Sequence, residues 1–384
     1  MIIGKKKLPV SKLRALVFYL LVFFAVASIP SCKVGRFIWY NYANITDYKI
    51  FPSRPLHASD KPFRFIEALK NAEIENHLRI VNHAKDTLSM KSFLEKSPTV
   101  AFLILRNDSL IYEKYFHGYT ESSDVASFSV AKSYVSALIG IAIKDGYITS
   151  EHDLVIRYLP ELDKGGHWRK LTIYHLLQMT SGVGFSEKYT TPFSDAASFY
   201  YGRNLRNMVL RSEIEKEPMT EFDYISINTQ LLAMVIEKAT GRTVTEYLDE
   251  KIWKPLGMEY DASWSIDKKK NGIEKAFCCI NAKARDFAKF GRLYLNKGYW
   301  NGASIIPEEW IEKSTSINRD SGGAWYYNRQ WWIGSEQNNH YSAVGHRGQY
   351  IFIKPDKNIV IVRLGKDRAK EEWIDIIRQV ALQL

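Results

Sequence analysis

The sequence predicts an α/β (α+β) fold, in which one antiparallel sheet is built from both ends of the chain and flanked by helices. Two β-hairpin patterns support this prediction, one within residues 99–115 and the other within residues 349–364. Between them, residues from about 120 to 300 are rich in helical patterns and would form a mostly helical insert. Of the 384 residues, 46% are hydrophobic and 25% are charged, which suits a large folded core and excludes a disordered tail.

The N-terminal residues differ in charge from the rest of the chain. Residues 1–36 hold seven Lys and Arg and no Asp or Glu, and they include an uncharged apolar run at 15–29. This run is shorter than the roughly 20 residues of a bilayer-spanning helix, and a basic cluster before it is typical of export signals. We expect residues 1–32 to be a signal peptide, a lipoprotein signal ending at Cys32, or a retained membrane anchor. The chain would then be exported, to a bacterial periplasm, or attached to a membrane.

The remaining charge and the cysteines exclude other classes of protein. The whole chain has a formal net charge of +11, and much of it lies in the N-terminal segment. The body is therefore only mildly basic, which disfavours a nucleic-acid binder. Three cysteines cannot form a disulfide-stapled scaffold, and the adjacent Cys278 and Cys279 are interpreted as small buried residues rather than metal ligands.

The main domain is expected at residues 61–384. Residues 33–60 are aromatic and irregular, and we interpret them as a tether. Apolar residues at helical spacing predict a helix within 65–84. The strands of the two hairpins are expected at 99–105, 110–115, 349–353 and 359–364. A final helix would carry Trp373, Ile374, Ile377 and Val380 on one side.

The chemistry points to a serine and a lysine. The sequence contains no G-x-S-x-G, H-E-x-x-H or phosphate-binding Gly-Lys-Ser/Thr pattern, but S-x-x-K occurs at Ser129–Lys132 and at Ser265–Lys268. Ser265 leads into a charged run, which would leave its lysine in water. Ser129 opens an apolar segment that predicts a buried helix, where the i, i+3 spacing places Lys132 on the same face. The alternative for this pair is an ordinary helix-capping serine with a surface lysine.

Further motifs follow in a fixed order along the chain. They are Thr180-Ser181-Gly182, Tyr224-Ile225-Ser226-Ile227-Asn228, Ala284-Arg285-Asp286 and Gly345-His346-Arg347-Gly348-Gln349. Together with Ser129–Lys132, this order resembles the serine β-lactamase/penicillin-binding-protein-like superfamily. The closest branch looks like class C β-lactamases, their esterase relatives and 6-aminohexanoate-dimer hydrolases. The resemblance covers about residues 97–380.

The resemblance implies roles for individual residues. Ser129 matches the family's nucleophile, Lys132 its motif lysine, and Tyr224 the tyrosine of its Tyr-x-Asn element. Ser226 stands where many members have Asn, so substrate contacts should differ there. His346-Arg347-Gly348 falls where other members have Lys-Thr-Gly or His-x-Gly. The backbone N–H groups of Ser129 and Gln349 would form the oxyanion hole. One departure is Pro218-Met219-Thr220, where relatives commonly have Pro-Gly.

These residue types suit acyl transfer. A serine hydroxyl needs a base within hydrogen-bond reach. Lys132 could be that base if burial lowers its pKa, or it could stabilise the phenolate of Tyr224, and the sequence leaves both alternatives open. Histidine is mostly neutral at pH 7, so His346 would hold a substrate carboxylate more weakly than lysine would, unless Arg347 points inward.

The sequence therefore predicts a serine hydrolase that cleaves an ester or amide of a small molecule or peptide, with no metal or organic cofactor. One alternative is a peptidase or carboxypeptidase on D-amino-acid peptides, or a weak β-lactamase. Another is a penicillin- or peptide-binding sensor that is acylated without turnover.

Overall fold

The computed structural model describes residues 17, 19, 33–40 and 42–384. The expected signal or anchor at 1–32 lies almost entirely outside these residues. The chain forms two compact units, one of 44–185 with 203–384 and the other of 1–43 with 186–202. In the described part of the smaller unit, helix α2 (Lys33–Tyr40) packs against helix α8 (Asp195–Tyr201). None of the helices built from described residues is long and apolar enough to span a bilayer.

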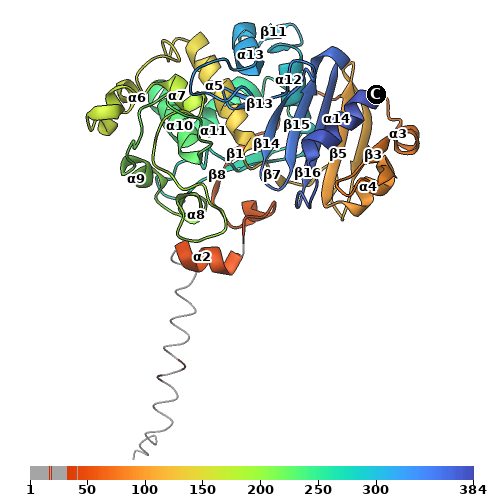
Figure 1. The fold of residues 1–384 in the computed structure, drawn as a ribbon, viewed down its shortest axis with the longest axis horizontal. Helices are drawn as coiled ribbons and strands as arrows, with labels where there is room; N and C mark the ends of the chain where they lie inside the picture. Colours follow the sequence, from red (N-terminus) through yellow and green to blue (C-terminus); the bar gives the residue numbers. More distant parts are fainter. Residues whose placement is uncertain (1–16, 18, 20–32, 41) are drawn as a thin grey trace, which may run out of the picture. The chain divides into compact units, whose positions relative to one another are not determined.

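The larger unit is organised around an eight-stranded sheet (Figure 1). Its strands, in the order in which they lie side by side, are β12 (Tyr327–Asn328), β13 (Trp331–Ile333), β14 (Tyr341–Gly345), β15 (Gln349–Lys354), β16 (Ile359–Gly365), β5 (Thr99–Arg106), β6 (Ser109–Tyr115) and β2 (Ile66–Glu67). Every neighbouring pair is antiparallel except β2 with β6. Strands from the C-terminal end of the chain thus pair with strands from the N-terminal end, as the sequence predicted.

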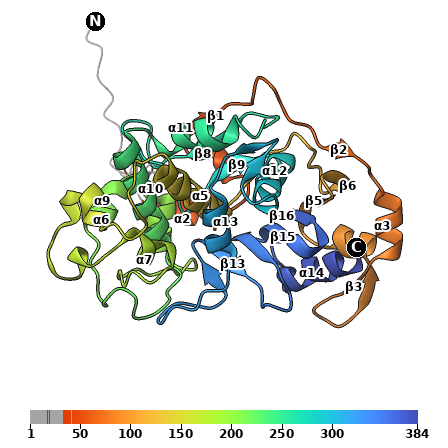
Figure 2. The ribbon, with the colours of Figure 1, turned by 90° about the horizontal axis from the view of Figure 1, so that it is seen from above.

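Two layers of helices cover this sheet. Figure 2 shows the strands β15 and β16 between helix α12 (Ala284–Leu295) and helix α14 (Trp373–Gln383). Side chains alternate between the faces of a strand, so Ile359 and Ile361 pack with Trp373 of α14. Val360, on the opposite face, lies so close to Gly291 of α12 that a side chain at Gly291 would overlap it. Helices α3 (Asn71–His77) and α4 (Met90–Lys96) complete the core on the α14 face.

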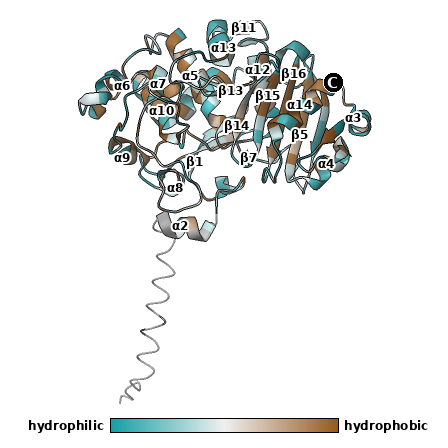
Figure 3. Cartoon of the chain, in the orientation of Figure 1, coloured by the Kyte–Doolittle hydropathy of each residue, from teal (hydrophilic) through white to brown (hydrophobic). Residues whose placement is uncertain are grey.

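The helix-rich region between the hairpins surrounds helix α5 (Val130–Lys144), which packs against helix α10 (Ser226–Thr240). Gly241 ends α10 with a positive φ of 69°, a conformation in which glycine is favoured. Other helices of this region include α6 (Val155–Tyr158), α7 (Ile173–Leu177), α9 (Leu205–Leu210), α11 (Val244–Leu248), a π-helical turn (Asp249–Trp253) and α13 (Glu308–Thr315). Figure 3 shows hydrophobic colour running along the central strands, in agreement with the buried residues of the core.

The interpretation of residues 33–60 as a tether is wrong for its last part. Strand β1 (Ser53–Leu56) pairs antiparallel with β8 (Ala262–Ser265) in a second sheet, whose other strands are β9 (Ile280–Ala282) and β7 (Val125–Ala126). Pro55 is tolerated because β1 is an edge strand, and Leu56 is fully buried. Three strands of this sheet interrupt the region that the sequence predicted as mostly helical.

The single helix predicted within 65–84 is also wrong. Only α3 is helical there, and it lies between β2 and a small hairpin of β3 (Arg79–Val81) with β4 (Thr87–Ser89). Asn82 and Asp86 close the turn of this hairpin through reciprocal backbone and side-chain hydrogen bonds. A further small hairpin is formed by β10 (Tyr299–Trp300) and β11 (Ala303–Ser304). By contrast, both predicted hairpins and the final helix are confirmed.

Candidate active site

Ser129 and Lys132 meet at the start of α5. Ser129 is the N-cap residue of this 15-residue helix, and the Nζ atom of Lys132 lies 3.1 Å from Ser129 Oγ. Lys132 is only 1% exposed, so its ammonium or amine group works in a largely dry environment. The interpretation of this pair as a capping serine with a surface lysine is excluded, because Lys132 is buried and the Ser129 side chain makes no capping hydrogen bond.

The second S-x-x-K pattern has none of this geometry. Ser265 lies within strand β8, where its hydroxyl accepts a hydrogen bond from Asn281 Nδ2 at 3.1 Å. Lys268 points elsewhere and donates to Asn204 Oδ1 at 3.4 Å. Strand β8 ends at Ser265 and Lys268 lies beyond it, so no helical turn places the two side chains on one face.

Lys132 is held by groups from three parts of the chain. Its Nζ atom donates to the carbonyl oxygen of Phe277 at 2.9 Å and reaches Ser226 Oγ at 3.5 Å. It also lies 5.1 Å from the centre of the Tyr224 ring and 5.9 Å from that of Phe277. The predicted residues Ser129, Tyr224 and Ser226 therefore surround the amino group of Lys132. The sequence motifs did not reveal the carbonyl of Phe277.

Tyr224 is positioned by aromatic packing just before α10. Its ring lies 5.4 Å from that of Trp332 and meets that of Tyr327 edge-on at 5.7 Å, measured between ring centres. Met179 joins the same cluster. These contacts limit the motion of the ring, so the phenol stays beside Lys132 without depending on the hydroxyl.

The Thr180-Ser181-Gly182 segment supports α10 from the side. Ser181 Oγ donates to Asn228 Oδ1 at 2.6 Å, and both side chains are buried. A side chain at Gly182, whose φ is 70°, would overlap the carbonyl of Lys216. Beside it lies a small cavity of about 120 Å³, lined in part by Met179 and Asp223. The motif thus holds the loop next to Tyr224 in place.

The backbone before the serine is strained. Phe128 has a φ of 46°, which is unfavourable for a bulky side chain and marks a sharp turn into α5. Its ring meets the ring of His346 edge-on, with 5.6 Å between ring centres. Gly345 lies so close to the carbonyl of Ser127 that no side chain would fit there. These contacts bring the turn between β14 and β15 beside the start of α5.

This turn holds the remaining predicted site residues. Partial burial, together with the charges of Arg347 and Arg368, lowers the pKa of His346, so its imidazole is neutral at pH 7. Arg347 pairs with Asp367 Oδ2 at 3.0 Å. Gln349 begins β15, and its buried side chain is fixed to the Gly365 backbone by two hydrogen bonds of 2.7 and 3.0 Å.

Gly348 completes the turn, with a φ of 84° that favours glycine. Its carbonyl oxygen accepts a hydrogen bond of 2.6 Å from Nη1 of Arg363. No local sequence pattern connects Arg363, a strand residue, with this turn.

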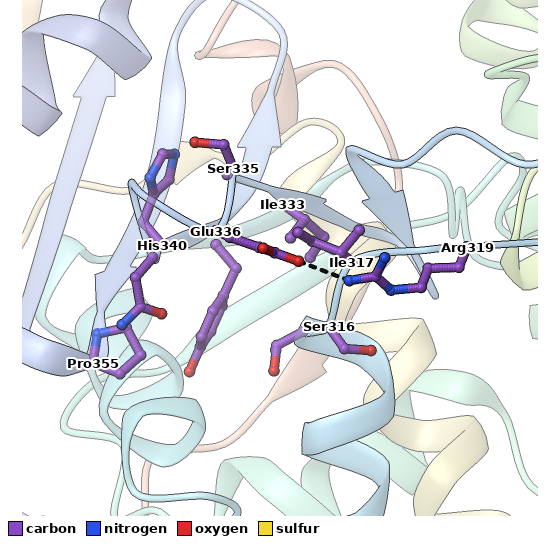
Figure 4. A pocket seen from close by; sticks show the side chains of 12 residues that line it. Ser316, Ile317, Arg319, Ile333, Ser335, Glu336, His340 and Pro355 are labelled. Carbon is purple, nitrogen blue, oxygen red and sulfur yellow. Dashed lines mark hydrogen bonds and ion pairs between the residues drawn. The ribbon is translucent and has the colours of Figure 1, made fainter.

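A disulfide lies next to the site, and a separate pocket lies elsewhere in the larger unit. The predicted burial of Cys278 and Cys279 is confirmed, but the two residues are also joined by a disulfide directly after Phe277. A larger pocket has a volume of about 450 Å³. The ion pair of Arg319 with Glu336 crosses it and His340 borders it (Figure 4). Its lining includes Ser316 and Ser335 but no lysine, so it lacks the serine–lysine pair of the candidate active site. No group of three His, Cys, Asp or Glu residues could hold a metal ion among the described residues.

The fold and this geometry together define a class of protein. An antiparallel sheet covered by helices, with an S-x-x-K motif opening a core helix beside it, is the architecture of serine hydrolases with the β-lactamase and penicillin-binding-protein fold. The chain belongs to the Beta-lactamase family, whose sequence profile matches residues 89–384.

Known relatives agree with this membership. The chain is 28% identical over 298 residues to the 6-aminohexanoate-dimer hydrolase of Paenarthrobacter ureafaciens, a match that covers 71% of this chain and 73% of that protein. A solved structure from Bacillus anthracis, assigned as a 6-aminohexanoate-dimer hydrolase, superposes with a TM-score of 0.79 and 26% identity, over 90% and 93% of the two chains. A D-stereospecific amidohydrolase from Streptomyces shares the fold at 16% identity, with a TM-score of 0.56 over 75% and 94%. The protein is therefore a serine hydrolase.

Proposed function

We propose that the protein hydrolyses an ester or amide bond through a covalent acyl-enzyme on Ser129. The observation that carries this proposal is the 3.1 Å distance between Oγ of the partly exposed Ser129 and Nζ of the buried Lys132. Ser129 Oγ would bond to the substrate carbonyl carbon while the leaving alcohol or amine departs with the serine's proton. Water would then attack the acyl-enzyme, release the acid and return a proton to Ser129.

The proton transfer uses Lys132 and Tyr224 in one of two ways. If Lys132 is neutral, its amine accepts the proton of Ser129 directly. If it is charged, it stabilises the phenolate of Tyr224, which then acts as the base. The 5.1 Å distance between Lys132 Nζ and the centre of the Tyr224 ring supports a coupled pair in both cases.

The negative charge of the tetrahedral intermediate needs hydrogen-bond donors. We assign this role to the backbone N–H groups of Ser129 and Gln349. Ser129 lies at the positive end of the α5 dipole, which favours an anion at this position. Removal of one such donor from a serine hydrolase lowers kcat by about 10²- to 10³-fold.

The site favours substrates that carry no obligatory carboxylate. His346 is neutral at pH 7, and Arg347 is engaged by Asp367. The site therefore attracts a substrate carboxylate less strongly than the sites of members that have a lysine at this position. Esters and linear amides that do not depend on a carboxylate contact are the substrate classes that we propose, and the names of two relatives support cleavage of an amide bond.

The test is a panel of p-nitrophenyl esters, linear amide oligomers, D-amino-acid peptides and a chromogenic β-lactam. Ser129→Ala should abolish turnover of whichever substrate works best. Ser265→Ala, in the second S-x-x-K pattern, is the matched control and should keep wild-type turnover. A Ser129→Ala enzyme with wild-type rates contradicts the proposal, and exclusive activity on D-peptides or the β-lactam supports the alternative substrate class.

A stoichiometric trap is distinguished from an enzyme by following the acylated protein over time. The wild-type protein is labelled with a fluorescent penicillin or a chromogenic ester, and the loss of label is recorded. Release with repeated turnover supports the hydrolase, whereas a label that persists would identify a sensor.

We also propose that the N-terminal segment exports the chain or attaches it to a membrane. Its support is the basic cluster and the apolar run at 15–29. Fractionation of cells that express the full chain should place it outside the cytoplasm, and Cys32→Ala separates the alternatives. Loss of a lipid-sized mass from the mature protein in this variant supports a lipoprotein, and cytoplasmic accumulation of the wild-type chain contradicts export.

A further inference from the structure

Arg363 is a buried cation behind the proposed oxyanion hole. It lies on β16 and is 0% exposed. Its guanidinium donates to the carbonyl of Gly348 at 2.6 Å, to Thr99 Oγ1 at 3.0 Å and to the carbonyl of Asp367 at 3.0 Å. All three acceptors are neutral groups.

The surroundings form a socket for this guanidinium. Its central carbon lies 3.4 Å from the centre of the Trp373 ring, so the plane of the guanidinium is covered by an aromatic face. A side chain at either Gly348 or Gly365 would overlap the guanidinium. Two glycines and a tryptophan thus leave a space that fits an arginine and fixes its position.

Neutral groups hold this cation directly, and the charge of Asp367 favours it only from beyond ion-pair distance. Within the described part of the chain, Arg363 forms no ion pair. Desolvation by burial lowers the pKa of Arg363 to about 9, which still leaves it protonated at pH 7. A buried cation without a direct ion-pair partner is costly, because removing a charge from water is unfavourable unless a partner compensates. We therefore look for a role of Arg363 that requires its charge or its hydrogen bonds, which a hydrophobic residue would lack.

That role follows from the peptide unit between Gly348 and Gln349. The carbonyl that Arg363 contacts and the N–H of Gln349 belong to the same planar group, and in a trans peptide they point in opposite directions. A cation on the oxygen fixes the plane and draws electron density from the nitrogen. The N–H on the far side becomes a stronger donor, as in hydrogen-bond chains whose members polarise one another.

The side chain of Gln349 holds the other end of the same unit. Its two hydrogen bonds to the Gly365 backbone and one of 3.2 Å to the His346 carbonyl prevent the turn from rotating. The contacts of Arg363 and of the Gln349 side chain with Gly365 both involve β16, which lies inside the sheet. The turn is therefore oriented by the core rather than by the substrate.

We propose that Arg363 is a positioning residue that orients and polarises the Gly348–Gln349 peptide, so that the Gln349 N–H stabilises the oxyanion. This inference rests on the proposed function, since it assumes an oxyanion formed by attack of Ser129. Arg363 touches no reacting atom and acts through the peptide, so it should affect the transition state more than substrate binding.

The experiment compares Arg363→Met and Arg363→Lys with two controls. Arg292→Met removes another buried arginine, stacked on Trp300 at 4.2 Å, from a place away from the turn. Thr99→Val removes one acceptor of Arg363 but leaves its contact with Gly348 intact. Thermal unfolding of each variant accounts for differences in stability, and Arg363→Lys keeps a cation if Arg363→Met fails to fold.

The expected result is a fall in kcat of about 10- to 100-fold for Arg363→Met, with KM changed by less than about threefold. The affinity for an arylboronic acid, which forms a tetrahedral adduct with a serine, should fall by the same factor as kcat. Arg363→Lys should recover part of kcat, and both controls should keep it.

Two results would overturn the inference. One is an Arg363→Met enzyme that is folded and has wild-type kcat and boronate affinity. The other is a loss that appears in KM alone or equally in Arg292→Met. Failure of the proposed function looks different: Ser129→Ala would then stay active and the wild-type protein would form no boronate adduct.

Discussion

The carbonyl oxygen of Phe277 lies 2.9 Å from the Nζ atom of Lys132, although 145 residues separate them in the sequence. This contact turns the amino group toward Ser129 and Tyr224 and gives it a hydrogen-bond partner that carries no charge. Because this partner is neutral, the contact forms no salt bridge, and it is compatible with both of the proton-transfer routes that we propose for Lys132.

Replacing Lys132 with methionine should lower kcat by about 10²- to 10⁴-fold, since the proton of Ser129 loses its acceptor or the cation that supports it. Methionine keeps most of the buried volume, so the protein should fold. Lys132→Arg should remain inactive, because a guanidinium stays protonated and needs more space. Steady-state kinetics checks both variants, and Lys268→Met, from the second S-x-x-K pattern, is the control. Wild-type kcat in Lys132→Met would refute the role of the lysine.

Removing only the hydroxyl of Tyr224 should lower kcat by about 10²-fold without a change in melting temperature. The reason is that the ring of Tyr224→Phe can keep its packing against Trp332 and Tyr327. Tyr327→Phe is a matched control, because the buried Tyr327 hydroxyl has no hydrogen-bond partner among the described residues. Equal kinetics of the two variants would show that the Tyr224 hydroxyl takes no part in proton transfer.

A lysine in place of His346 should shift substrate preference toward carboxylates. The lowered pKa of His346 leaves it neutral at pH 7, whereas lysine adds a cation on the edge of the site. For a partly exposed position we expect a two- to fivefold gain in kcat/KM for a carboxylate-bearing ester over its neutral analogue. The gain should disappear at high salt. His346→Gln should show no gain, and a gain in that variant would rule out charge as the cause.

The stability of the protein should depend on His340 in mildly acidic solution. Desolvation lowers the pKa of His340 to about 4, and Arg378 and Lys354 act in the same direction. Between pH 6.5 and 4 the unfolded chain binds a proton that the folded protein does not, so stability is lost as the pH falls through this window. His340→Gln should retain about 2 kcal/mol more of its free energy of unfolding than wild type over this range.

Urea unfolding at a series of pH values measures this difference. His83→Gln, at an exposed histidine, is the control and should follow the wild-type pH dependence. Parallel curves for His340→Gln and wild type would mean that His340 titrates normally in the folded protein.

The parts of the site that the sequence predicted are those set by local geometry or by motif order. Ser129 and Lys132 meet because three residues make almost one helical turn, and the apolar stretch after them predicts a buried helix. The sequence also predicts the hairpins at 99–115 and 349–364, because the two strands of each hairpin are close in the chain and their turns are polar.

What the sequence could not predict depends on contacts between distant segments. The Phe277 carbonyl is a backbone group, which no side-chain pattern reveals. Arg363 lies in a strand of apolar residues, and its role needs the pairing of β15 with β16 as well as the stacking on Trp373. Strand β1 looked irregular because four residues with a proline acquire strand geometry only beside β8.

The most direct test of the account is a mass measurement of the enzyme during turnover. Wild-type protein is mixed with an excess of a p-nitrophenyl ester, quenched in acid, and its intact mass and proteolytic peptides are determined. We expect a mass increase equal to one acyl group, located on Ser129 and absent from Ser129→Ala. An acyl group on another residue, or full turnover by Ser129→Ala, would contradict the acyl-enzyme on Ser129.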